Sequence, residues 1–464
     1  MTTKTVKPFG FKDKLGYMFG DFGNDFTFML SSIMLMKFYS DVMGVSVGLV
    51  GTMMMLARFV DAFTDVAMGQ IVDRSKPRAK GKFLPWILRM CGPVAVASFL
   101  MYASWFQDMP MGFKIFWMFF TYLLWGSVFY TSINIPYGSM ASAISADPKE
   151  RAQLSNWRTI GASLAGMFIG VVLPLIVYYE DANGNTVLSG TRTTVAAVIC
   201  SIGSIICYLL CYGMVTERVK VEQKTEKFNL KELLLGLVRN KSLIGIVVAS
   251  ICMLLVQLTS STMMTYVYPN YFGNTQAQAA AGVIGTLVTF ICAAFTVKLS
   301  QKIGRKELSI FASILGAVVF AVAYFLHTDN AWIFVGLYAV SYIGMAVFSL
   351  ICWAMITDVI DDTEVQTGDR SDGTIYAVYS FARKLGQAAS SGVSGLLLSL
   401  IGYSQATAFD TDVVNGIYDI TCLVPLIGYI LLAVVLKFLY PLNKARVEEN
   451  TRILAKKREV AEAE

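Results

Sequence analysis

Long runs of apolar residues alternate with short polar segments along the whole chain of 464 residues. A helix needs about 20 mostly apolar residues to cross the hydrocarbon core of a bilayer. Lipid offers no water to unpaired backbone groups, so apolar runs of that length are expected to be helical. The pattern predicts twelve membrane spans, at residues 17–39, 46–71, 84–106, 114–137, 158–179, 194–215, 242–268, 279–300, 307–327, 331–356, 374–402 and 417–440.

The composition of the chain supports the prediction of membrane spans. Apolar residues make up 55% of the chain and charged residues 15%, whereas a soluble domain carries about 25% charged residues. That apolar content is enough for about twelve spans. A soluble enzyme, a disordered chain and a disulfide scaffold are therefore excluded, and we expect an all-α membrane protein.

The sequence has few of the residues and motifs that catalytic sites require. The chain has one histidine, His327, in a short polar turn, so neither a zinc-protease motif nor a Ser-His-Asp triad can form. No Walker A loop is present for ATP hydrolysis. We therefore expect no enzyme activity and no organic cofactor. A lipid flippase is an alternative function from a different class. It predicts that lipid, and not sugar, raises the thermal stability of the protein.

Basic residues are distributed very unequally between the two sets of loops. Of the 38 Lys and Arg residues, 29 lie in the tails and in one alternate set of loops, and two lie in the other set. Basic loops stay in the cytoplasm, so both termini are expected to be cytoplasmic in a multi-pass protein of the cell membrane. The net charge of +6 is thus an orientation signal, and no nucleic acid partner is expected.

The longest internal polar stretch separates six predicted spans from six. We therefore expect an N-terminal half at residues 1–215, a cytoplasmic linker at 216–241, a C-terminal half at 242–440 and a cytoplasmic tail at 441–464. Two six-helix halves are typical of the major facilitator fold, in which the substrate binds near the midplane between the halves. A monomer is expected to be the functional unit.

The second span carries charges that a membrane helix normally avoids. Arg58, Asp61 and Asp65 are spaced i, i+3, i+7 and share one helix face, with Thr64 beside them. A charge in mid-membrane costs about 2.5–3.5 kcal/mol and usually marks an ion or substrate path. Such an oxygen cluster suits a hard cation such as Na⁺, but two adjacent carboxylates could equally share a proton. A purely structural Arg58–Asp61 pair is the simpler alternative.

Other spans also carry polar groups within apolar runs. Pro136 is expected to break the helix ladder of the fourth span, and Trp125 and Trp353 could offer apolar faces to a sugar ring. The further polar residues are Asp21 and Asp25 in the first span, Tyr130, Thr131 and Asn134 in the fourth, Arg158 in the fifth, and Arg383 and Lys384 in the eleventh.

Several long segments carry a resemblance to a known family. They read KLGYMFGDFGNDF, LARFVDAFTDVAMGQIVDR, NIPYGSMASAISADPKERAQLSNWRTIGASLAG and WAMITDVIDDTEVQTGDRSDGTIYAVYSFARKLGQA. With the twelve-span spacing, they resemble the glycoside–pentoside–hexuronide:cation symporters of the major facilitator superfamily over nearly the whole chain. The resemblance implies cation-coupled symport of a sugar into the cell by alternating access.

The resemblance also assigns candidate site residues. It implies a cation site at Asp61 and Asp65, which would be the metal ligands if the cation is Na⁺, with oxygen donors at Thr64 and Thr131. The eleventh span aligns with the family pattern after a one-residue shift, which assigns Lys384 to the sugar. The sugar-binding residues are expected to be Asp25, Tyr130, Asn134, Arg158, Trp353, Tyr379, Ser380 and Lys384.

Departures from the melibiose-permease-like branch leave the ligands open. That branch has Asn where Thr64 stands, so the coupling cation stays open between Na⁺ and H⁺, with Li⁺ as a third candidate. It has Asp where Asn134 stands and Trp where Gly138 stands, which predicts a roomier and less acidic sugar wall. The sugar stays open among an oligosaccharide, a pentoside and a glucuronide, although Asp25 argues against a carboxylate.

Two further questions stay open at this level. The same scaffold could serve an uncoupled facilitator, an exporter or a sugar sensor that does not transport. The predicted loop 357–373 carries acids that either pair with basic cytoplasmic loops to close an inner gate or form a solvated acidic loop. These acids are Asp358, Asp361, Asp362 and Glu364.

Overall fold

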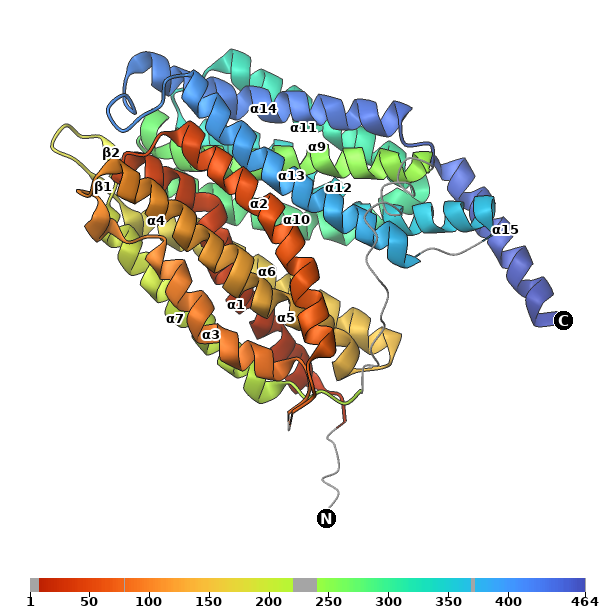
Figure 1. Ribbon diagram of the computed structural model, residues 1–464. Coiled ribbons are helices and arrows are strands. Elements are labelled where there is room, and N and C mark those ends of the chain that lie inside the picture. The colour runs from red at the N-terminus through yellow and green to blue at the C-terminus, as the bar shows by residue number, and fades with distance from the viewer. Residues whose placement is uncertain (1–7, 79, 220–239, 369–371, 464) are drawn as a thin grey trace. The chain divides into compact units, whose positions relative to one another are not determined.

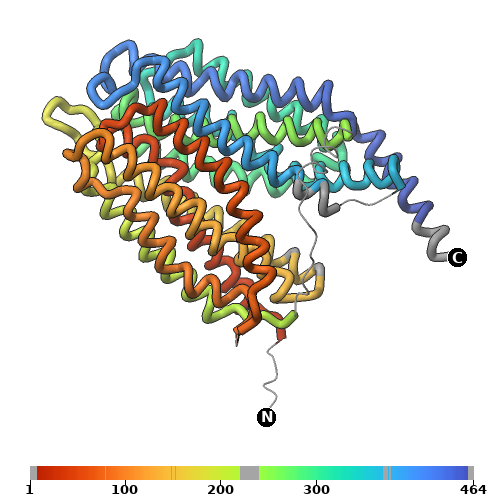
Figure 2. Tube along the Cα trace, viewed as in Figure 1, coloured from red at the N-terminus to blue at the C-terminus, as the bar shows by residue number. Residues whose placement is uncertain are grey.

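The computed structural model describes residues 8–78, 80–219, 240–368 and 372–463 (Figure 1). Within these residues a helix lies at each of the twelve predicted spans. The chain divides into two compact units, whose courses can be followed in Figure 2. Unit 1 comprises Met1–Lys227 and Leu398–Phe409, and unit 2 comprises Phe228–Leu397 and Asp410–Glu464.

Unit 1 consists of long helices and one small hairpin. Its α-helices are α1 (Phe11–Lys37), α2 (Val47–Arg74), α3 (Leu84–Leu100), α4 (Met111–Leu123), α5 (Thr131–Ile144), α6 (Pro148–Val177) and α7 (Gly190–Met214). The π-helical segments η1 (Phe38–Val42) and η3 (Leu124–Tyr130) and the 3₁₀ turn η2 (Ser104–Phe106) join them. The strands β1 (Tyr178–Glu180) and β2 (Thr186–Leu188) pair antiparallel between α6 and α7.

Unit 2 follows the same plan without a hairpin in its described residues. The last turn of α13 is grouped with unit 1. The helices are α9 (Lys241–Tyr266), the π-helical η4 (Val267–Tyr271), α10 (Thr275–Ile303), α11 (Arg305–Leu326), α12 (Ala331–Thr367), α13 (Asp372–Leu400), α14 (Thr411–Phe438) and α15 (Lys444–Ala463). The helix α15 lies in the predicted tail, and residues 220–239 of the predicted linker lie outside the described residues.

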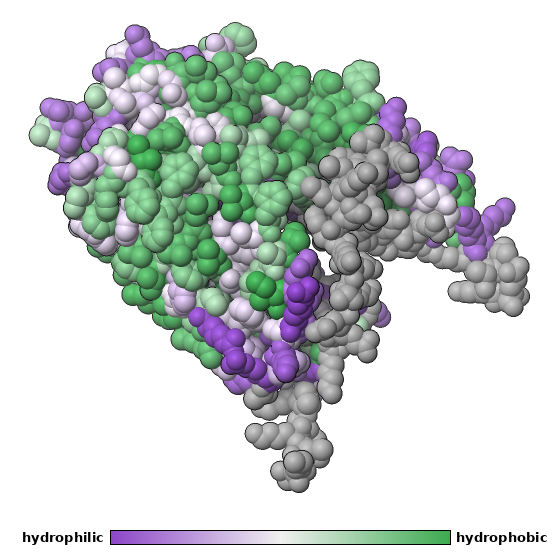
Figure 3. All heavy atoms as spheres, in the orientation of Figure 1, coloured by the Kyte–Doolittle hydropathy of each residue, from purple (hydrophilic) through white to green (hydrophobic). Residues whose placement is uncertain are grey.

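The outer faces of these helices are apolar. Large side chains such as Phe63, Phe311 and Phe325 are 71%, 69% and 82% exposed, which is unfavourable in water but expected in lipid. On the face shown in Figure 3, apolar residues cover the lengths of the helices and hydrophilic residues gather towards their ends. Among the described residues, nine helices are long and apolar enough to cross a membrane. The protein is therefore an all-α membrane protein.

The acidic segment after the tenth span is helical, so the predicted loop at 357–373 was wrong. The helix α12 continues to Thr367. Two of its acids are neutralised within unit 2: Arg305 pairs with Asp358, and Arg446 Nε lies 3.2 Å from Asp362 Oδ1. Both aspartates are buried, so they are not a solvated acidic surface.

The helix also continues past Pro136, where the ladder lacks the hydrogen bond that proline cannot donate. Pro136 lies inside α5, and the irregular segment is η3, which ends at Tyr130, one residue before α5 begins. A π-helical turn inserts an extra residue into the helix and is frequent at functional sites. The backbone irregularity therefore precedes the proline and lies in the segment Leu124–Tyr130.

The segment Leu398–Phe409 joins two helices of unit 2 but packs as part of unit 1. Its Tyr403 is buried, and the hydroxyl donates to Asp41 Oδ1 at 2.8 Å. The Lys37 amine, 1% exposed, lies 2.9 Å from Asp41 Oδ2 and 3.2 Å from the Tyr403 hydroxyl. The buried lysine is thereby neutralised and hydrogen-bonded, as a buried charge requires.

The helices α1 and α6 approach closely at a glycine. A Cβ atom built on Gly161 would lie 2.5 Å from the carbonyl oxygen of Met18. Small residues permit such backbone approaches between membrane helices, where dispersion and hydrogen bonding replace the hydrophobic driving force. Gly161 therefore sets the spacing of two helices that both carry candidate sugar-binding residues.

Candidate functional site

Two aspartates of α2 are held by two hydroxyls of the neighbouring chain segment η3–α5. The Ser127 hydroxyl donates to Asp61 Oδ1 at 2.6 Å, and the Thr131 hydroxyl lies 2.7 Å from Asp65 Oδ1. Both the aspartates and the hydroxyls are four residues apart, so the contacts repeat along the two helical segments. We call these four residues the α2 ladder. Sequence reasoning found three of them and missed Ser127.

A glycine allows this close approach. A Cβ atom on Gly126 would lie 3.4 Å from Asp61 Oδ1, at the tight end of ordinary packing. The Gly126 carbonyl oxygen also lies 3.1 Å from the Thr131 hydroxyl. The π-helical segment η3 thus brings a hydroxyl and a carbonyl oxygen to the face of α2 that carries both carboxylates.

Arg58 lies on the same face but binds its aspartate loosely. Its Nη1 is 3.8 Å from Asp61 Oδ2, while the guanidinium stacks over Phe28 at 4.9 Å. The structural Arg58–Asp61 pair therefore exists. Thr64 hydrogen-bonds the carbonyl oxygen of Asp61 on its own helix at 3.2 Å.

The oxygen donors of the α2 ladder match the preferences of a hard cation. In the part of the chain that the structure describes, no group of three or more His, Cys, Asp or Glu residues could hold a metal ion. Two carboxylates with hydroxyl and carbonyl oxygens suit Na⁺ or Li⁺, and the same two carboxylates could bind a proton.

The other polar candidates of unit 1 form a second group on α1 and α6. Arg158 Nε donates to Asp21 Oδ1 at 2.9 Å, and the guanidinium stacks over Tyr137 at 5.5 Å. Asp25 is partly buried and interacts electrostatically with both Asp21 and Arg158. The ion pair with Asp21 was not predicted, because a contact between residues 137 positions apart has no local signal.

The aromatic candidates of this group are packed against one another. Tyr130 stacks on Phe28 at 5.9 Å and meets Trp125 at 5.2 Å. Trp125 is 1% exposed, so it is a packing residue and offers no open face to a sugar. Asn134 is partly buried and makes no side-chain hydrogen bond with the described residues.

Unit 2 contains its own polar cavity of about 240 Å³. Trp353 and Tyr379 line it as candidates, together with Arg383, Gln257, Ser250 and Ser349. Ser380 and Lys384 are not among its lining residues. Arg383, one position before the predicted Lys384, stacks over Trp353 at 5.6 Å. The family alignment of the eleventh span was uncertain by one position, and in the structure it is Arg383, not Lys384, that lines the cavity.

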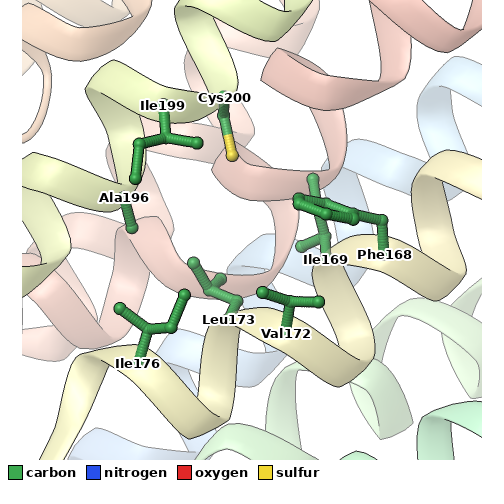
Figure 4. Close-up of a pocket in the computed structure, with 8 residues that line it drawn as sticks. All are labelled: Phe168, Ile169, Val172, Leu173, Ile176, Ala196, Ile199 and Cys200. Carbon is green, nitrogen blue, oxygen red and sulfur yellow. The ribbon is translucent and has the colours of Figure 1, made fainter.

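A second crevice lies between α6 and α7 of unit 1, with a volume of only about 20 Å³ (Figure 4). Its eight lining residues contribute carbon and one sulfur, from Cys200. It offers no polar group to orient a sugar, so it is not a candidate site.

The Ser127 hydroxyl gives a first prediction. Replacing Ser127 by alanine removes a hydrogen bond to a charged group, which is worth about 1.5–3 kcal/mol in a buried setting. We expect the apparent affinity for the coupling cation to change by about tenfold. Sugar-dependent thermal stabilisation titrated with NaCl measures this. The matched control is Ser132→Ala, since among the described residues the Ser132 hydroxyl bonds only the Val128 carbonyl and the Met68 sulfur. An equal shift in both variants would contradict the prediction.

Comparison with known proteins gives a family and several relatives. The family model described as MFS/sugar transport protein matches residues 16–444. The uncharacterized symporter YjmB of Bacillus subtilis is 29% identical over 96% of this chain and 95% of its own. The isoprimeverose transporter of Lactiplantibacillus pentosus is 28% identical over 93% and 89%. A putative 2,3-dihydroxypropane-1-sulfonate exporter of Salmonella typhimurium is 29% identical over 94% and 93%.

Solved structures resemble the chain in fold. A bacterial homologue of the lysosomal transporter Spinster has a TM-score of 0.67 at 9% identity, over 97% of this chain and 98% of that one. The D-xylose–proton symporter has a TM-score of 0.61 at 13% identity, over 93% and 96%. At these identities the likeness concerns the fold alone.

Proposed function

Because the chain belongs to the MFS/sugar transport protein family, we propose that it carries a glycoside into the cell in symport with a monovalent cation. The α2 ladder is the observation that carries this proposal. Two carboxylates in an apolar helix repel each other until a cation or a proton intervenes. Nothing in an uncoupled sugar channel requires such a pair.

Cation binding and sugar binding assist each other in this mechanism. A cation bound by Asp61 and Asp65 relieves their repulsion, so that α2 and η3 become ordered against each other. Because η3 ends at Tyr130, its ordering also orients a residue proposed to contact the sugar. A cation that raises sugar affinity must itself be bound more tightly when sugar is present.

The proposed sugar contacts are polar side chains available in the two units. In unit 1, Asp25 and Asn134 offer oxygen and amide groups, and Arg158 and Tyr130 add donors and an aromatic surface. In unit 2, Tyr379 and the half-exposed Trp353 line the cavity. An aromatic face with convergent polar groups is the usual chemistry of a sugar site. Ser380 and Lys384 stay candidates from the family resemblance alone.

The driving force follows from the cation. One cation moving down a tenfold gradient supplies about 1.4 kcal/mol, enough for about tenfold accumulation of sugar. A membrane potential adds about 2.3 kcal/mol per charge per 100 mV, or about 50-fold more for a neutral sugar. We propose that the protein acts as a monomer in the cell membrane, with both termini in the cytoplasm.

Reconstituted transport tests the proposal. The full chain in liposomes is given a radiolabelled glycoside with a tenfold inward gradient of Na⁺, Li⁺ or H⁺ and the potential clamped at zero. We expect about tenfold accumulation with one of these cations, and equilibration without a gradient. Equilibration under all three gradients would contradict symport.

An exporter is the second candidate, because one relative is named as a putative exporter. The same liposomes distinguish it when they are preloaded with sugar. Uphill efflux against an imposed gradient with no uphill uptake would favour export. Sugar-dependent thermal stabilisation with no transport in either direction would favour a sensor.

A further inference from the structure

The cavity of unit 2 contains a positive charge that nothing in its lining neutralises. Arg383 is the twelfth residue of α13, a helix of 29 residues, so it lies well inside the eleventh span that the sequence predicts. No Asp or Glu lines the cavity, and among the described residues Arg383 makes no ion pair and no hydrogen bond. Charged residues inside membranes are normally paired, and an exception marks a substrate path.

Two other arginines of the predicted spans show the contrast. Arg158 pairs with Asp21 at 2.9 Å, and Arg58 lies 3.8 Å from Asp61. Each therefore has a carboxylate of its own unit. Arg383 has instead the face of Trp353 at 5.6 Å, which holds the guanidinium in place without neutralising its charge.

The neighbours of Arg383 are neutral hydrogen-bonding groups. The Tyr379 hydroxyl lies 3.1 Å from Cys352 Sγ, which in turn lies 3.5 Å from Ser250 Oγ. Gln257 and Ser349 also line the cavity. Such a wall can bind sugar hydroxyls and leaves the guanidinium as the strongest recognition group.

We infer that Arg383 binds an anionic group of the substrate, so that the transported glycoside is an acidic sugar bearing a carboxylate or a sulfonate. This inference rests on the proposed sugar transport. A guanidinium presents paired N–H donors that match the two oxygens of a carboxylate and fit a sulfonate similarly. It reverses the expectation drawn from Asp25, whose charge lies in unit 1 beside Arg158.

The charge of the substrate determines whether the membrane potential drives its transport. An acidic sugar moving with one monovalent cation transfers no net charge, so the membrane potential does not drive it. A neutral sugar on the same carrier would gain about 50-fold per 100 mV.

Matched sugar pairs test the inference on the purified full chain. Methyl glucoside is compared with methyl glucuronide and with its 6-sulfo analogue, and the same set is made in the galacto series, at constant ionic strength and saturating NaCl. Binding is measured by calorimetry. We expect at least one acidic member to bind at least tenfold more tightly than its neutral partner, and the two acids identify carboxylate or sulfonate as the preferred anion.

Three variants assign the preference to a residue. Arg383→Gln should reduce the acidic preference to less than threefold, and Arg383→Lys should retain part of it. Arg452→Gln, on the exposed face of α15, controls for net charge and should retain the preference. Loss of the preference in Lys384→Gln instead of Arg383→Gln would overturn the assignment.

The remaining outcomes separate this inference from the proposed symport. Equal or tighter binding of every neutral member, or no binding by any acidic member, overturns the inference. Cation-driven accumulation of a neutral glycoside would then leave symport standing. An acidic preference without cation-driven accumulation supports the inference and contradicts symport.

Discussion

Replacing Asp61 by asparagine is expected to abolish cation-driven accumulation, reducing it from about tenfold to onefold under a tenfold cation gradient. Asparagine nearly preserves the volume and can still bond Ser127, which lies 2.6 Å from Asp61 Oδ1. It removes the negative charge that makes a cation necessary. Equilibration of sugar down its own gradient should persist, because no proposed sugar contact is deleted. Radiolabelled uptake in liposomes, with and without the gradient, measures both quantities.

The companion variants sharpen this result. Asp65→Asn should also uncouple transport, since Thr131 and Asp65 form the second contact of the α2 ladder. Asp73→Asn is the matched control, because Asp73 lies on the same helix and is 57% exposed. Undiminished accumulation by Asp61→Asn would show that the cation binds elsewhere.

Replacing Gly161 by alanine is expected to destabilise the protein by about 1–3 kcal/mol, the usual cost of overpacking. The added Cβ would lie 2.5 Å from the Met18 carbonyl oxygen, and a backbone atom cannot rotate away. The helices α1 and α6 must separate, which also displaces Asp21 from Arg158. The melting temperature in detergent should fall by several degrees, and sugar affinity should fall with it.

Gly166 on the same helix provides the comparison. A Cβ atom there would approach nothing closer than Met29 Cε, at 4.0 Å. Alanine should therefore be tolerated at Gly166, and it gains up to about 1 kcal/mol from the higher helix propensity. Equal melting temperatures for the two variants would show that the α1–α6 contact is not tight.

Hydropathy predicted the helices well because a bilayer leaves the backbone few alternatives. The prediction fails where a helical segment carries charged residues, because its hydropathy is then low. The acids Asp358 and Asp362 resemble a loop in sequence, but each has an arginine partner in unit 2, and α12 extends past them. A partner that far away in sequence has no signature in the local pattern.

Local spacing also predicted some features of the candidate sites and missed others. The spacing of Arg58, Asp61 and Asp65 predicts one helix face, and the structure has it. Ser127 was missed because a serine in an apolar run is common, and only its four-residue offset from Thr131 matches the aspartates. At the eleventh span, Arg383 and Lys384 are adjacent cations, and only the rotation of α13 decides which one lines the cavity. Which of these residues bind ligand stays a prediction.

The docking of Leu398–Phe409 has a consequence for dividing the protein. A cut in the linker yields two fragments that follow the order of the sequence, yet the N-terminal fragment would lack Tyr403, which donates to Asp41 and lies 3.2 Å from the Lys37 amine. That fragment would carry a buried lysine with an incomplete set of partners. The compact unit formed by the six N-terminal spans is therefore incomplete without a segment from the second half of the sequence. Their last piece is synthesised only after nearly the whole chain.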